Sequence, residues 1–126
     1  MPIELHYDES TSVVTMTAKG IVTIEEVIEY ENIFISQYPT PREFIEIIKT
    51  EELDDVVFSY TSFKALAISI EQWKKHGQKA TLFCAFSQKH KEIAELLLPI
   101  FQHLDITIQV CYSPEELQEM TQALGV

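Results

Sequence analysis

An apolar run in the second half of the chain constrains the fold most. Residues 80–86 read ATLFCAF, contain no glycine or proline, and lie between Gly77 and Ser87. A run that is apolar on both faces is typical of a strand buried on both sides of a sheet. Ser87 is a good helix N-cap, and apolar residues then recur at helical spacing from Ile93. The sequence therefore predicts a buried strand followed by a helix, and the flanking segments repeat this plan.

Four further strands are predicted. Ile3, Leu5 and Tyr7 alternate with polar residues, which indicates an edge strand with one solvent-facing side. The short polar turn after it predicts a hairpin with a second strand over residues 13–19, which we expect to end at Gly20. The third strand is predicted over residues 44–49 and is followed by an acidic linker over residues 50–57, and the fifth alternates over residues 106–111.

The remaining helices have clear local signals. Thr23 with Glu26 has the spacing of a capping box, and prolines 39 and 41 should stop that helix. The next helix is predicted to run from a cap at Ser59, Thr61 or Ser62 to residue 76, with Gly77 closing it. In the third helix, proline 99 should cause a kink or a break, and the SPEE sequence at 113–116 is a strong start for the last one.

Together these elements predict a single α/β layer domain spanning residues 1–126, in the order β-β-α-β-α-β-α-β-α. The sheet should be five-stranded and mostly parallel, with an N-terminal hairpin. Because the first and last strands alternate instead of being apolar throughout, we expect the helices to lie mainly on one face.

The charge of the chain excludes some partners. Twenty acidic residues against nine basic ones give a net charge of −11, which disfavours nucleic acids and anionic membranes. Neither a signal-peptide pattern nor an apolar stretch of about 20 residues is present, so a cytoplasmic protein is expected. Cys84 and Cys111 fall in predicted strands and are interpreted as buried thiols, with a redox pair as the alternative.

Catalytic and metal-binding spacings are missing. The four histidines are scattered, and the three glycines form no phosphate-binding loop. The acidic cluster Glu51, Glu52, Asp54 and Asp55 lacks the ligand spacing of a calcium loop, and a solvated loop is the better interpretation. We therefore predict a non-enzymatic protein without a cofactor or metal.

Three stretches carry a resemblance to a known family: GIVTIEEV after the second strand, WKKHGQKATLFCAF around the fourth, and VCYSPEELQEM at the end. In this order they resemble the STAS domain, in particular its stand-alone SpoIIAA-like members. In regulatory members of that family, a serine in an Asp-Ser-Ser/Thr-Gly-type motif after the third strand is phosphorylated by a partner kinase. Here that stretch reads EELDDVVFSYTSFKAL, without an aspartate directly before a serine or a glycine after one, so the chain resembles more closely the members that lack this switch.

The resemblance implies a regulatory domain that binds a protein partner. We predict that the partner contacts the loop and helix start after the third strand, through Asp54, Asp55, Phe58, Ser59, Tyr60, Thr61 and Ser62. The alternative is a carrier or sensor of a small apolar ligand, held between helices and sheet by Phe58, Phe63, Phe86 and Phe101. A homodimer is also expected if a sheet face or edge is left open.

Overall fold

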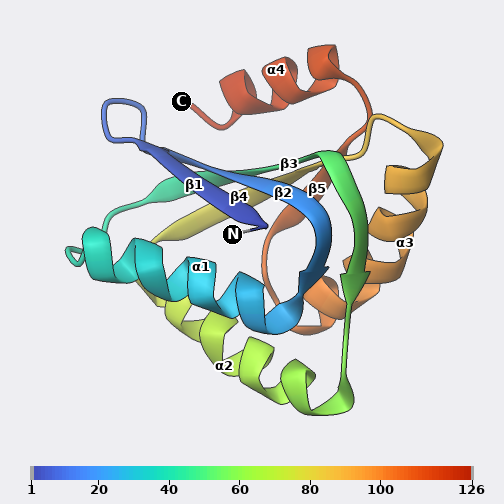
Figure 1. The fold of residues 1–126 in the computed structure, drawn as a ribbon. Helices are drawn as coiled ribbons and strands as arrows, with labels where there is room; N and C mark the ends of the chain where they lie inside the picture. The colour runs from blue at the N-terminus through green and yellow to red at the C-terminus, as the bar shows by residue number, and fades with distance from the viewer. Residues whose placement is uncertain (1, 126) are drawn as a thin grey trace.

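The computed structural model describes residues 2–125, which form one five-stranded sheet in the spatial order β1-β2-β3-β4-β5 (Figure 1). The strands are β1 (Ile3–Asp8), β2 (Val13–Thr23), β3 (Phe44–Val57), β4 (Gln78–Cys84) and β5 (Ile108–Cys111). β1 pairs with β2 in antiparallel orientation, and every other neighbouring pair is parallel. The predicted α/β class, the order of strands and helices along the chain, and the N-terminal hairpin are confirmed.

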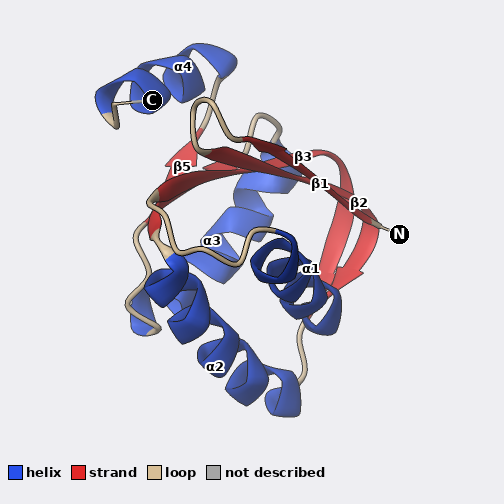
Figure 2. Cartoon of the chain, turned by 90° about the vertical axis from the view of Figure 1, so that its left-hand side faces the viewer, coloured by secondary structure: helices blue, strands red, loops and turns tan. Residues whose placement is uncertain are grey.

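Three of the four helices cover one face of this sheet. The helices are α1 (Ile24–Gln37), α2 (Tyr60–His76), α3 (Gln88–His103) and α4 (Pro114–Ala123). Each parallel crossover moves one strand further in the same direction, and right-handed crossovers of this kind leave their helices on a common face. α4 follows the last strand without returning to the sheet, and Figure 2 shows it on the opposite face.

The helix starts are those that the sequence predicts. Thr23 and Glu26 form a reciprocal capping box, and the side chains of Ser59, Ser87 and Ser113 each accept a hydrogen bond from the backbone N–H three residues on. These bonds satisfy donors that a helix cannot satisfy internally. The predicted break in the third helix is wrong, because α3 continues through Pro99. Pro99 and Glu95, whose carbonyl loses its partner, are both exposed, so water can replace that bond.

Three strand boundaries also differ from the prediction. β2 does not end at Gly20 but runs to Thr23, because Gly20 adopts a positive φ of 65° beside a shift of register. Residues 50–57 are not a linker but the outer half of β3, paired with residues 19–23 of β2. The acidic residues there tolerate a strand because their side chains point to solvent while the backbone is paired. The fifth strand begins at Ile108, two residues later than predicted.

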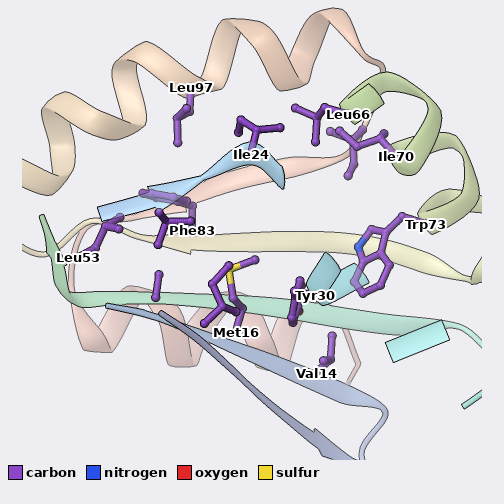
Figure 3. Packing of buried hydrophobic residues seen from close by; sticks show 14 of the residues in the cluster. Val14, Met16, Ile24, Tyr30, Leu53, Leu66, Ile70, Trp73, Phe83 and Leu97 are labelled. Atoms are coloured by element: carbon purple, nitrogen blue, oxygen red, sulfur yellow. The ribbon is translucent and has the colours of Figure 1, made fainter. Parts of the chain in front are cut away.

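The core consists of two clusters separated by the sheet. The larger one lies between the sheet and helices α1 to α3, and it contains Tyr30, Leu66 and Trp73 from the helices and Val14 from β2 (Figure 3). The smaller one joins Ile45, Leu82 and Cys111 to the apolar side of α4. Leu117, Met120 and Leu124 pack there as predicted. Alternate residues of β3 and β4 therefore face two different cores.

Candidate protein-binding surface

The junction between β3 and α2 lies where β3 extends beyond its neighbour. β4 pairs with β3 only as far as Ile48, whereas β2 accompanies β3 to Val57. At the point where β4 departs, the Thr50 hydroxyl donates a hydrogen bond to the carbonyl of Cys84. The outer half of β3 therefore has a neighbouring strand on one side only, and it leads directly into the cap of α2 (Figure 1).

Acidic side chains cover this outer half. Only Leu53 of the stretch 51–55 is buried; the other four side chains are exposed, namely Glu51, Glu52, Asp54 and Asp55. Lys89 Nζ lies 2.9 Å from Asp54 Oδ1, and Lys19 Nζ lies 3.8 Å from Glu52 Oε2. Within residues 2–125, neither Glu51 nor Asp55 has an ion-pair partner, so the strip keeps a negative excess.

The N-terminus of α3 fixes the position of this acidic strip. His90 Nε2 donates a hydrogen bond to the carbonyl of Leu53 over 2.9 Å, since a carbonyl can only accept. The Ser87 hydroxyl lies 2.8 Å from the other ring nitrogen of His90 and caps α3. Because His90 itself is buried, the backbone of β3 is held at Leu53 although β4 no longer accompanies it.

The three predicted hydroxyls at the junction have different surroundings. Ser59 is the N-cap of α2, and its side chain accepts from the backbone N–H of Ser62 over 3.2 Å. Ser62 is buried, and its hydroxyl returns hydrogen bonds to the backbone of Ser59. Only Thr61 is exposed without a role in the capping box. Ser59 and Ser62 therefore stabilise the start of α2, whereas Thr61 does not take part in the capping box.

Apolar side chains are exposed beside the acids. Tyr60 is 97% exposed, Val57 is 47% exposed, and Ile21 on the neighbouring strand is 62% exposed. Ile21 pairs with Asp55 and Thr23 pairs with Val57, so these side chains lie on the same outward side of β2 and β3. Phe58 turns the other way and packs against the large core. We call the surface of Ile21, Asp54, Asp55, Val57 and Tyr60 the junction surface.

The structure does not bring the four predicted ligand-binding phenylalanines together. Phe58 and Phe101 pack against the large core, whereas Phe86 packs against the small core on the other face of the sheet. Phe63 is half-buried at the start of α2. Five surface cavities within residues 2–125 are lined by other residues and by none of these four.

The structure contains a buried carboxyl cluster that the sequence analysis does not predict. Glu46 of β3 is only 4% exposed, and its two oxygens accept hydrogen bonds from Tyr30 Oη and Thr81 Oγ1, both at 2.7 Å. Glu31 of α1, also 4% exposed, accepts a hydrogen bond from the hydroxyl of Ser69 on α2. A usable signal exists for Glu46, because alternation in FIEIIK places it on the same face as Phe44 and Ile48.

Burial changes the protonation of this cluster. Burial and the neighbouring Glu46 carboxyl raise the pKa of Glu31 to about 8, although the hydrogen bond from Ser69 opposes this shift. Burial also raises the pKa of Glu46, against the opposing hydrogen bonds from Tyr30 and Thr81. The indole N–H of Trp73 favours the ionised carboxylate too, although its geometry falls short of a hydrogen bond within the described residues. Glu31 is therefore mostly protonated at neutral pH.

The two cysteines are register partners on the neighbouring strands β4 and β5. Both thiols are free and buried. Burial raises the pKa of Cys84 to about 12 and that of Cys111 to about 11. A thiol with such a pKa stays protonated and is a poor nucleophile, which favours the structural interpretation.

Comparisons with known proteins place the fold. No protein-family model matches the chain, and no curated protein does either. Among solved structures, the chain is similar to that of the anti-sigma factor antagonist SpoIIAA in its unphosphorylated form, with a TM-score of 0.52 and 14% sequence identity. The similarity covers 98% of this chain and 99% of that one. The phosphorylated form of the Bacillus cell fate determinant SpoIIAA gives a TM-score of 0.48 at 13% identity, over 94% of this chain and 98% of that one.

The chain therefore shares the α/β fold of SpoIIAA, as its resemblance to SpoIIAA-like domains implied. This likeness extends over the whole length of both chains, although few residues are identical. No helix within residues 2–125 is long and apolar enough to cross a membrane.

Proposed function

We propose that this chain is a non-enzymatic regulatory domain that binds another protein through the junction surface. Tyr60 carries the proposal, because it is 97% exposed and follows the exposed Val57 by three residues, and a group of exposed apolar side chains is typical of a binding site. Tyrosine is also a residue type enriched among those that dominate binding energy. The fold supports the same role, since the solved SpoIIAA structure with this architecture is that of an anti-sigma factor antagonist.

The charges indicate what kind of partner fits. The unpaired acid Asp55 lies among the apolar residues of the junction surface, and the whole chain carries a net charge of −11. A partner with lysines or arginines around an apolar pocket would complement both features. We therefore expect association that weakens as salt is added, because the charged rim is exposed.

A matched pair of tyrosine variants tests the surface. The protein and its Tyr60→Ala and Tyr112→Ala variants are immobilised, and proteins retained from an extract of the source cells are quantified by mass spectrometry. Tyr112 is also exposed but lies after β5, where Lys91 contacts its ring. We expect a partner that Tyr60→Ala loses by about tenfold or more and Tyr112→Ala retains, as for a hot-spot residue.

A charge variant extends the same experiment. Asp55→Asn removes one acid that has no ion-pair partner within the described residues, so it should weaken retention without changing the fold. Circular dichroism of each variant checks the fold. Equal retention of every captured protein by Tyr60→Ala, Tyr112→Ala and the unmodified chain would contradict the junction surface as the binding site.

Self-association is a separate prediction. β1 pairs only with β2, so its outer backbone edge has no neighbouring strand in the described part of the chain. An edge of this kind can pair with a second copy. Analytical ultracentrifugation at high micromolar concentration distinguishes a dimer from a monomer, and a monomer would rule out this mode. The cytoplasmic location expected from the sequence also stays a prediction.

A further inference from the structure

A cleft of about 500 Å³ opens at the other end of the molecule from the junction surface. It is formed by the end of β1, the end of α1, the loop from α1 to β3, and the end of α2. α2 separates the two places, because it begins at the junction and ends at His76 in the cleft wall (Figure 1). A volume of this size suits a small organic molecule.

Three aromatic rings make one wall of the cleft. The ring centroids of Tyr7 and Tyr38 lie 4.6 Å apart, and those of Tyr7 and Phe34 lie 4.9 Å apart in edge-to-face geometry. Phe34 is buried beneath the two half-buried tyrosines. His76 Nε2 donates a hydrogen bond to the carbonyl of Tyr38 over 2.7 Å, which fixes the chain there. The apolar wall is therefore formed before any ligand arrives.

The only arginine of the chain lines the same cleft. Arg42 makes no ion pair within residues 2–125, although acids outnumber basic residues by 20 to 9 in this sequence. An uncompensated guanidinium in so acidic a protein is available to an anion, and its planar fork matches a carboxylate.

The backbone of Arg42 is held in place. Its N–H donates to the carbonyl of His76 over 3.1 Å. Gly77 approaches so closely that a Cβ atom there would lie 2.1 Å from the carbonyl oxygen of Arg42, and Gly77 also has a φ of 126°. Only glycine fits this contact, so the loop carrying Arg42 is anchored to the end of α2.

We propose that this cleft binds a small carboxylate with an apolar body. The body packs on Tyr7 and Tyr38, and Arg42 binds the carboxylate. Glu9 also lines the cleft, and its charge opposes an anion, so its removal should strengthen binding. The site goes beyond the proposed protein-binding role and does not depend on it.

Three matched probes test the charge preference. The ¹⁵N-labelled protein is titrated at pH 7 with phenylacetate, phenylacetamide and phenethylammonium, and separately with hexanoate, while amide shifts are followed by NMR. For at least one carboxylate we expect saturable shifts at Tyr38, Arg42 and His76 with a dissociation constant of about 1 mM or below. Phenylacetamide should bind at least about tenfold more weakly than phenylacetate, if phenylacetate is the carboxylate that binds.

Charge variants then assign the site. Arg42→Gln should weaken carboxylate binding about tenfold or more, whereas Lys64→Gln, which changes the net charge equally on the exposed side of α2, should leave it unchanged. Glu9→Gln should tighten binding by about twofold to fivefold. Absence of a saturable shift with either carboxylate up to about 10 mM would overturn the proposal. Equal carboxylate affinity in Arg42→Gln, or tighter binding of the ammonium probe, would overturn it too.

Discussion

The two halves of β3 hold carboxylates in opposite environments. Glu46, in the inner half, is buried and receives hydrogen bonds from α1 and β4, whereas the acids of the outer half face solvent. The difference arises because β4 pairs with the inner half, whereas β2 is the only strand beside the outer half within residues 2–125. The same residue type therefore supports the core at one end of a strand and forms a candidate binding surface at the other.

This contrast has an energetic basis. A buried carboxyl group loses its hydration, and only well-placed donors can compensate for that loss. An exposed carboxylate keeps its water and contributes little to stability, even when a lysine lies nearby. Substitution of Glu46 should therefore alter folding, while substitution of the exposed acids in the outer half should mainly alter association.

The largest expected effect is that of Glu46→Ala. The substitution leaves the hydroxyls of Tyr30 and Thr81 buried without their acceptor and opens a cavity. We expect the free energy of unfolding at pH 7 to fall by about 3–5 kcal/mol, measured by urea denaturation. The matched variant Glu52→Ala, in the exposed half, should change it by less than about 0.5 kcal/mol. Equal effects of the two variants would remove the distinction between the halves.

The second effect is a dependence of stability on pH. Glu31 holds its proton up to about pH 8 in the folded protein, whereas its ordinary pKa is 4.5. Between these values the folded state holds the Glu31 proton more tightly than the unfolded chain, so the contribution of Glu31 to the free energy of unfolding is largest below pH 4.5 and is lost as the pH rises to 8. The slope reaches about 1.4 kcal/mol per pH unit for one such group, or roughly 2–4 kcal/mol from pH 5 to 8.

Glu31→Gln should reduce this slope. Glutamine still offers an oxygen to the hydroxyl of Ser69 but has no proton to release. Glu29→Gln, on the exposed side of the same helix, should leave the slope as it is. Urea denaturation at half-unit intervals of pH measures it, and an unchanged slope in Glu31→Gln would show that another group controls the pH dependence.

The third effect concerns a single donor to Glu46. Tyr30→Phe removes the hydroxyl and keeps the ring, whose centroid lies 5.7 Å from that of Trp73. Loss of this hydrogen bond should lower the free energy of unfolding by about 1–3 kcal/mol. Tyr60→Phe changes an exposed hydroxyl and should have no measurable effect on stability. Thermal and urea unfolding compare the two variants, and a stability equal to that of the unmodified protein for Tyr30→Phe would mean that this bond contributes nothing net.

Local signals account for what the sequence could predict. Some signals act within a few residues and therefore define the elements and their order. They include capping residues such as Thr23 and Ser113, the prolines after α1 and the apolar run of β4. The sequence does not predict the outer half of β3, because its pairing with β2 is a long-range contact and its acidic side chains are untypical of a strand. Likewise, the role of Glu46 depends on donors that lie 16 and 35 residues away in sequence.

The junction surface and the cleft around Arg42 also differ in how far the sequence predicts them. Exposure of Tyr60 follows from its place in a helix cap, which the sequence shows, whereas the cleft around Arg42 needs three segments that meet only in the folded chain. The sequence does not indicate the aromatic wall of the cleft, because Tyr7 and Tyr38 are compatible with ordinary core packing. The distinction between Phe86 and the other predicted ligand residues likewise depends on which face of the sheet each occupies.

The smallest expected effect is that of the ion pair between Asp54 and Lys89. Its side chains are 67% and 52% exposed, so solvent screens the attraction across their 2.9 Å contact. A double-mutant cycle of Asp54→Ala and Lys89→Ala should give a coupling free energy of about 0.2–1 kcal/mol at low salt, which decreases when salt is raised. A coupling of several kcal/mol that resists salt would mean that the outer half of β3 behaves like the buried half. A small, salt-sensitive value would leave Asp54 free to exchange Lys89 for a basic group of a partner, as the junction surface requires.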